Sequence, residues 1–207
     1  MVLPYDFLDS MAWTVAAAAA LIGFAALRLR YKASTDTIDE NSKKLRTGFA
    51  AAIGACGLYL FITGLAISIM WPFGSPYGAQ YAPPFAGGYN NVLFGGVATL
   101  GGMVLLATAA AIYLNGGLSV VSYFAAVAGL YAAVDGFAIL SLWVTKQPLV
   151  SALGYLSFTA AGFLSIPATH SDNVWLRRLF MIFAFLFALA WLVQAMTFTL
   201  GHLGVIS

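Results

Sequence analysis

Residues 89–144 read YNNVLFGGVATLGGMVLLATAAAIYLNGGLSVVSYFAAVAGLYAAVDGFAILSLWV and contain a single charged side chain, that of Asp135. The stretch divides at Asn115-Gly116-Gly117, a tripeptide typical of a tight turn. Each half is longer than the roughly 20 apolar residues that an α-helix needs to cross a bilayer. Such segments cannot form a water-exposed surface, so the stretch predicts two antiparallel transmembrane helices.

The rest of the chain has the same character. Hydrophobic residues make up 62% of the sequence and charged residues 8%, with a mean hydropathy of +0.91, whereas about a quarter of an ordinary soluble domain is charged. We therefore predict an all-α, polytopic integral membrane protein with one helical domain over residues 1–207 and no soluble domain. The expected transmembrane helices cover residues 11–29, 48–70, 89–113, 118–144, 148–168 and 174–202.

The basic residues are distributed unequally between the loops. Eight of the nine lie in residues 28–46 or at Arg177-Arg178, two connections that six spans place on one side of the membrane. Lys and Arg are retained on the cytoplasmic side, so we expect a multi-pass protein of the plasma (cytoplasmic) membrane with both termini external. Residues 1–10 contain no basic residue and do not have the pattern of a cleaved signal peptide.

The first connection is the most polar part of the chain. Thr37 and Glu40 have the spacing of a capping box. We therefore expect a short surface helix within residues 35–46, separate from the next transmembrane helix.

Several local motifs resemble a known family. They are Trp71-Pro72 after a glycine-rich helix, Tyr89-Asn90 leading to Phe94-Gly95, Tyr131 and Gly136 in the following helix, and Lys146-x-Pro148. Over residues 59–168 the chain resembles an uncharacterised family, a domain of unknown function, of hydrophobic membrane proteins found mainly in archaea and acid-loving bacteria. Two features depart from that family's pattern: the link before Tyr89 is longer, and Gly96 stands where an acidic residue is expected. The resemblance implies a membrane protein and no particular chemistry.

Asp135 is the only acidic residue inside an expected span, and an ionisable side chain within a membrane is a functional hypothesis by default. We expect Asp135 to point into the bundle and to meet Tyr155 or the Asn90–Asn91 pair, with Tyr131 as a further partner. Two interpretations remain open. The cluster could bind a small ligand or quinone head group or pass a proton, or it could be a structural hydrogen-bond network between helices. The other polar residues expected at this level are Tyr89, Ser151, Gln194 and Thr197.

Small residues recur on one face of two expected helices. They follow spacings of four, three and four, and such faces let helix backbones approach closely. We expect packing within the chain, with the third helix against the fourth. The two sets are Asn91, Gly95, Ala98 and Gly102, and Ala125, Gly129, Ala132 and Gly136.

Cofactor and metal ligands are scarce. His170 and His202 are the only histidines and fall on opposite sides of the membrane, and Cys56 is the only cysteine. These residues cannot together hold a haem, copper or thiolate metal site. We expect no metal and no cofactor, and the net charge of +2 does not suggest nucleic acid as a partner.

The favoured function is that of a non-catalytic accessory or structural subunit of a larger, energy-converting membrane complex such as a respiratory one. Beyond the lipid bilayer, its expected partners are other membrane-protein subunits. They would contact an uncharged segment rich in aromatic residues, since aromatic surface without charge is typical of a buried interface. The alternative is a small transporter or channel-like protein with an outer-leaflet polar site around Asp135, and an enzyme acting on lipid is the least favoured. The expected interface residues are Trp71, Phe73, Tyr77, Tyr81 and Phe85.

Overall fold

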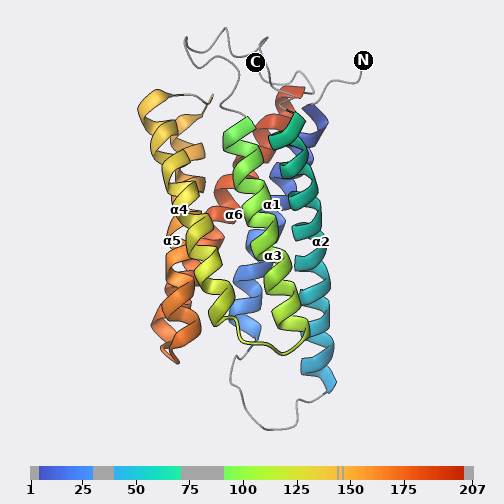
Figure 1. Cartoon of the computed structure of the whole chain (residues 1–207). Helices are drawn as coiled ribbons and strands as arrows, with labels where there is room; N and C mark the ends of the chain where they lie inside the picture. Colours follow the sequence, from blue (N-terminus) through green and yellow to red (C-terminus); the bar gives the residue numbers. More distant parts are fainter. Residues whose placement is uncertain (1–4, 30–39, 71–90, 144, 146, 203–207) are drawn as a thin grey trace.

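The computed structural model describes residues 5–29, 40–70, 91–143, 145 and 147–202, and all regular structure in these residues is helical. Six helices are long and apolar enough to cross a membrane, which confirms the all-α, multi-pass prediction. They stand side by side in one bundle, with the start of the first and the end of the last at the same end (Figure 1). The elements are α1 (Tyr5–Arg28), α2 (Glu40–Met70), the π-helix η2 (Asn91–Gly96), α3 (Val97–Tyr113), α4 (Ser119–Leu142), α5 (Pro148–His170) and α6 (Val174–His202).

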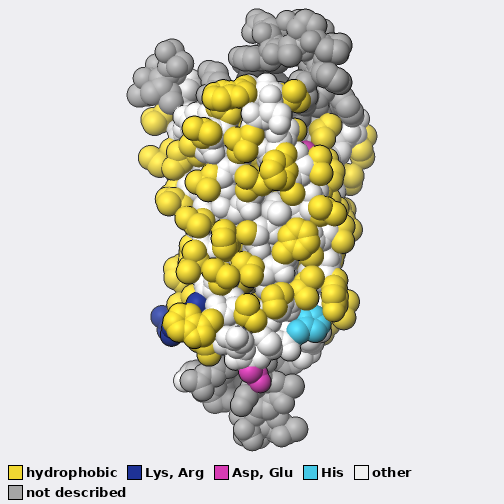
Figure 2. Space-filling view, turned by 90° about the vertical axis from the view of Figure 1, so that its left-hand side faces the viewer, with side chains coloured by type: hydrophobic (Ala, Val, Ile, Leu, Met, Phe, Trp, Pro, Cys, Tyr) yellow, Lys and Arg dark blue, Asp and Glu magenta, His cyan; other side chains and the backbone are white. Residues whose placement is uncertain are grey.

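The surface of the bundle has the composition that lipid requires. On the side drawn in Figure 2, hydrophobic side chains cover most of the height of the molecule, and the basic side chains lie close to its lower end. Exposed apolar residues recur along α4 at spacings of three and four, so that one whole face of this helix is apolar. These residues are Val120, Tyr123, Val127, Leu130, Val134 and Phe137.

The most extensive helix contacts are those of α4 with α5, α2 with α3, α1 with α6 and α5 with α6. Gly57 on α2 and Gly102 on α3 face each other so closely that a Cβ at Gly102 would lie 2.8 Å from the Gly57 carbonyl oxygen. On α4, Gly129 meets α5, where a Cβ at Gly162 would lie 2.6 Å from the carbonyl oxygen of Ala125. Packing within the chain is therefore confirmed for the glycines on these faces.

The expected pairing of the third helix with the fourth is wrong. The glycine face of α3 packs on α2, that of α4 packs on α5, and the contact between α3 and α4 is much smaller. The turn between α3 and α4 is as tight as expected, with Asn115 in the left-handed conformation at φ 57°, which asparagine tolerates. Sequence proximity and a short turn did not decide the pairing, because each glycine face is already occupied by another helix.

The α1–α6 pair is held by both polar and aromatic contacts. Trp13 Nε1 donates to Thr199 Oγ1 at 3.1 Å. Phe24 and Phe185 meet edge to face with ring centroids 5.2 Å apart, and Phe185 fills the space that a side chain at Gly23 would take. The first and last helices of the chain are thus direct neighbours over much of their length.

The separate surface helix expected within residues 35–46 is not formed by its described part. Residues from Glu40 onward are the first turns of α2, which runs to Met70 without a break. Lys44 and Glu40 form an i,i+4 ion pair at 2.8 Å along this helix, and no proline separates the polar turns from the apolar ones. The proposed N-cap, Thr37, lies outside the described residues.

Other helix ends differ by a few residues from the expected ones. The first helix begins at Tyr5, ahead of the expected start at Met11. The fourth ends at Leu142, two residues early, because Trp143 adopts the left-handed conformation at φ 51°. The fifth continues through Pro167 to His170, and the sixth has the expected bounds.

Candidate functional site

Three of the expected cluster residues are buried in the half of the bundle nearer the chain ends. Asp135 comes from α4, Tyr155 from α5 and Gln194 from α6. Tyr89 and Asn90 lie outside the described residues, and Asn91 is placed only by its backbone, at the start of η2. The expected interface residues Trp71, Phe73, Tyr77, Tyr81 and Phe85 also lie outside them.

Tyr155 links α5 to the π-helical segment. Its buried hydroxyl donates to the carbonyl oxygen of Leu93 at 2.5 Å. A π-helix is rare and marks functional or locally adapted positions. The bond ties the changed backbone of η2 to the core around Tyr155, Trp191 and Ile139.

Asp135 is buried, with 5% of its surface exposed, and the side chains of the expected partners Asn90 and Asn91 are not among those described. The Tyr155 hydroxyl is directed to Leu93, and within the described part of the chain the Oδ2 atom of Asp135 has no hydrogen-bond partner. Tyr131, one turn earlier on α4, lies against Gly96. The structure therefore brings Asp135 into the bundle without showing a network around it.

A second polar group lies nearer the start of α5 and the end of α6. Gln194 Nε2 donates to Ser151 Oγ at 2.8 Å in a buried contact, and Gln147 Nε2 donates to Thr197 Oγ1 at 3.3 Å. Beside the first pair is a cavity of about 10 Å³, close to the smallest volume that holds one water molecule. The indole Nε1 of Trp191, which lines this cavity, has no partner in the described residues.

A central chamber of about 290 Å³ has lining residues from all six helices. Its walls are apolar along most of their length, with many small residues such as Ala18, Ala19 and Ala184. Tyr155 and Trp191 are among its lining residues toward one end, and Asp135 is not in the lining. Sequence reasoning missed this chamber. The run of alanines at residues 16–20 of α1 is a signal of it, since small side chains leave space between helices.

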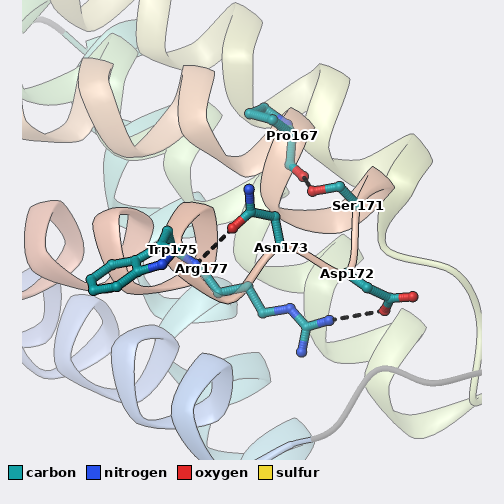
Figure 3. A network of polar contacts seen from close by, with 6 residues as sticks. All are labelled: Pro167, Ser171, Asp172, Asn173, Trp175 and Arg177. Atoms are coloured by element: carbon teal, nitrogen blue, oxygen red, sulfur yellow. Dashed lines mark hydrogen bonds and ion pairs between the residues drawn. The ribbon is translucent and has the colours of Figure 1, made fainter.

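Hydroxyl groups and one charge gather at the opposite end of the chamber, away from the start of α1 and the end of α6. Of the lining side chains that the structure describes, Arg177 alone is charged. It extends from the first turn of α6 toward Asp172, with Nη2 and Oδ1 3.3 Å apart (Figure 3). The same α5–α6 turn is fixed by the side chain of Asn173, which accepts from the backbone N–H of Trp175 at 2.9 Å, as an N-cap residue does. The hydroxyl-bearing residues at this end are Ser119, Ser122, Ser165 and Thr169.

The described residues contain few side chains that could together bind a metal ion. The described ranges contain no group of three or more His, Cys, Asp or Glu side chains near one another. What the arrangement can do chemically is to surround an apolar molecule and to present one cationic group at one end of it.

Removal of the Tyr155 hydroxyl tests how far the π-helical segment depends on it. We expect Tyr155→Phe to lower the free energy of unfolding by about 1 kcal/mol, because it leaves the buried Leu93 carbonyl without this donor. Thermal unfolding in detergent micelles measures the change. Tyr113→Phe, at the exposed end of α3, is the control and should leave stability unchanged. Equal stability of both variants with the parent would contradict a structural role for this bond.

Comparison with known proteins places the chain in a family. No curated protein and no solved structure matches it. The profile of one family, described as a protein of unknown function (DUF981), matches residues 1–204. The resemblance to an uncharacterised family is thereby confirmed, and the match extends well beyond residues 59–168. The chain belongs to the DUF981 family of proteins of unknown function.

Proposed function

We propose that this protein binds or carries a slender, largely apolar molecule inside the membrane, with the central chamber as its site. The observation that carries the proposal is the chamber itself, a space of about 290 Å³ with walls from all six helices. This volume is near the lower end of the range for small-molecule sites, which begins at about 300 Å³.

The energetics favour an apolar occupant. The apolar side chains that line this space lack packing partners on one side, so contact with an apolar occupant would be favourable. Water is a poor occupant, because apolar walls offer it few hydrogen bonds. A hydrocarbon chain would restore the missing contacts without any polar cost.

This proposal belongs to the transporter class but moves the site away from Asp135. A site around that carboxylate would need a cavity beside it, and Asp135 lines neither the chamber nor the smaller cavity. A chamber with apolar walls also suits an ion much less well than it suits a hydrocarbon chain.

A binding titration, with the parent and with a variant whose chamber is blocked, tests the proposal. The purified protein in detergent would be titrated with radiolabelled hexadecanol, which has the required shape and no charge. We expect saturable binding that Ala184→Phe abolishes, because Ala184 is buried and lines the chamber. Ala51→Phe places the same ring on an exposed face of α2 and should bind as the parent does. Absence of saturable binding to the parent, or equal binding by both variants, would overturn the proposal.

A second proposal is that the protein is a non-catalytic subunit of a larger, energy-converting membrane complex such as a respiratory one. It is favoured by the charge-free segment of residues 71–89, which contains Trp71, Phe73, Tyr77, Tyr81 and Phe85. Gentle solubilisation of native membranes should then yield a stable complex, and replacing two of these aromatic residues by serine should release the subunit. A chain that leaves native membranes alone would refute it.

We also propose that the protein lies in the plasma membrane with both termini external, because eight of nine basic residues fall at the opposite end. In a Cys56→Ala background, an impermeant thiol reagent added to intact cells should label Gly201→Cys and spare Ser42→Cys. Gly201 is exposed, with open space around it, and Ser42 is exposed in the first turns of α2. Ser75→Cys, outside the described residues, should also be labelled. The reverse pattern would refute the orientation.

A further inference from the structure

We propose that the ligand of the chamber is a single-chain amphiphile with an anionic head group, a carboxylate or a phosphate monoester. Its head lies against Arg177 and its chain extends toward Tyr155 and Trp191. This inference rests on the proposed function, since it needs a chamber that binds hydrocarbon, and it adds the chemistry and orientation of the occupant.

The polarity of the lining changes from one end of the chamber to the other. Among the described lining residues only Arg177 is charged, and the hydroxyl groups of Ser119, Ser165 and Thr169 lie toward the same end. Toward the other end the lining contains the rings of Phe94, Tyr155 and Trp191, with Phe94 and Trp191 packed edge to face at 6.2 Å. A molecule with one polar and one apolar end matches this gradient in a single orientation.

The guanidinium of Arg177 has donors to spare. The side chain is 28% exposed, so most of it is shielded, whereas its partner Asp172 is 80% exposed. An exposed pair of this kind contributes at most about 1 kcal/mol. Arginine carries five N–H donors in a fixed fork that fits a carboxylate or phosphate, and one contact to Asp172 leaves donors for a second anion (Figure 3).

The neighbouring arginine provides a natural comparison. Arg178 lies over the ring of Trp175, 5.0 Å from its centroid, and is not among the residues that line the chamber. The two side chains carry the same charge one residue apart, so substitutions at both alter the net charge equally. Only one of them alters the chamber.

The distance along α6 sets the length of the ligand. Arg177 and Trp191 are about four turns apart, roughly 21 Å at 1.5 Å per residue. This is more than half of the hydrocarbon thickness of a bilayer, which is about 30 Å. A long hydrocarbon chain can therefore reach Tyr155 and Trp191 when its head group lies at Arg177, and a short chain cannot.

The test compares head groups and chain lengths in the same titration. We expect palmitate and hexadecyl phosphate to bind the purified protein more tightly than hexadecanol, and octanoate to bind weakly. Arg177→Gln should weaken the better of the two anions about tenfold, as expected for the loss of a charged hydrogen bond, and leave hexadecanol unchanged. Arg178→Gln should change none of these affinities, and Arg177→Lys should restore part of the preference for the anion.

The outcomes distinguish the assignment of the head group from the proposal that the chamber binds a ligand at all. If hexadecanol binds as tightly as both anions, or if Arg177→Gln and Arg178→Gln behave alike, the head-group assignment is overturned while the chamber stands. If none of the probes binds saturably, the proposed function itself is overturned. The anion that binds best distinguishes a carboxylate from a phosphate head.

Discussion

Gly102→Val is expected to lower the free energy of unfolding by about 3 kcal/mol, at the upper end of the usual cost of overpacking. A Cβ at this position would contact the backbone nitrogen of Phe61 and lie 2.8 Å from both its Cα and the Gly57 carbonyl oxygen. These are backbone atoms of α2, so no side-chain rotation can make room. The pair α2–α3 would have to separate, and thermal unfolding in detergent micelles would record the loss.

The adjacent glycine is the matched control for this substitution. A Cβ at Gly101 has no other atom within 4 Å, so Gly101→Val adds the same side chain to the same helix without a clash. It should cost only a small fraction of the effect at Gly102. Equal destabilisation by the two variants would mean that helix propensity, and not the close approach of α2 and α3, determines the result.

Asp135→Leu is expected to raise the free energy of unfolding by about 1–3 kcal/mol, the usual cost of an unsatisfied buried polar group. Leucine has nearly the shape of aspartate but no polar atoms. The carboxylate is buried and its Oδ2 atom has no partner in the described residues, so its replacement removes a polar cost and breaks no described bond. Chemical or thermal unfolding of the purified protein measures the gain.

Gln194→Leu is the contrasting variant. Gln194 is equally buried but donates to Ser151 Oγ at 2.8 Å, so its loss should destabilise the protein by about 1 kcal/mol. A decrease in stability for Asp135→Leu as well would show that the carboxylate has a partner and is part of a structural network. If Asp135→Leu is more stable but loses ligand binding, the carboxylate is retained for function at a cost in stability.

The sequence predicted the helical spans because they depend on a single physical requirement. In hydrocarbon every backbone polar group must be hydrogen-bonded within the helix. Long apolar segments such as residues 174–202 can therefore be recognised from the sequence as transmembrane helices. The predicted start of α2 was wrong, because the boundary between polar and apolar residues is not the boundary of the helix. The change from polar to apolar residues near Gly48 marks the membrane surface, whereas the helix itself continues back to Glu40.

The candidate site was less predictable, because it depends on which faces meet. Burial of Asp135 followed from its cost in lipid, but its partner did not, since Tyr155 had a choice of acceptors and bonds the Leu93 carbonyl. That carbonyl belongs to a π-helical segment, and the spacing of apolar residues in the sequence does not indicate a π-helix there. The chamber escaped prediction because it is a space between helices, and its small lining residues are indistinguishable in sequence from those that pack tightly.

The direct pairing of α1 with α6 has a consequence for biosynthesis. A ribosome completes α1 early and α6 last, so the wall that these two helices form cannot exist until the whole chain has entered the membrane. Contacts between distant parts of a chain are slow to form, and the earlier helices must wait as a partial bundle with one side open to the surrounding lipid. Under the proposed function, α6 would complete the chamber last, and the first ligand would enter it from the bilayer in which the protein is made.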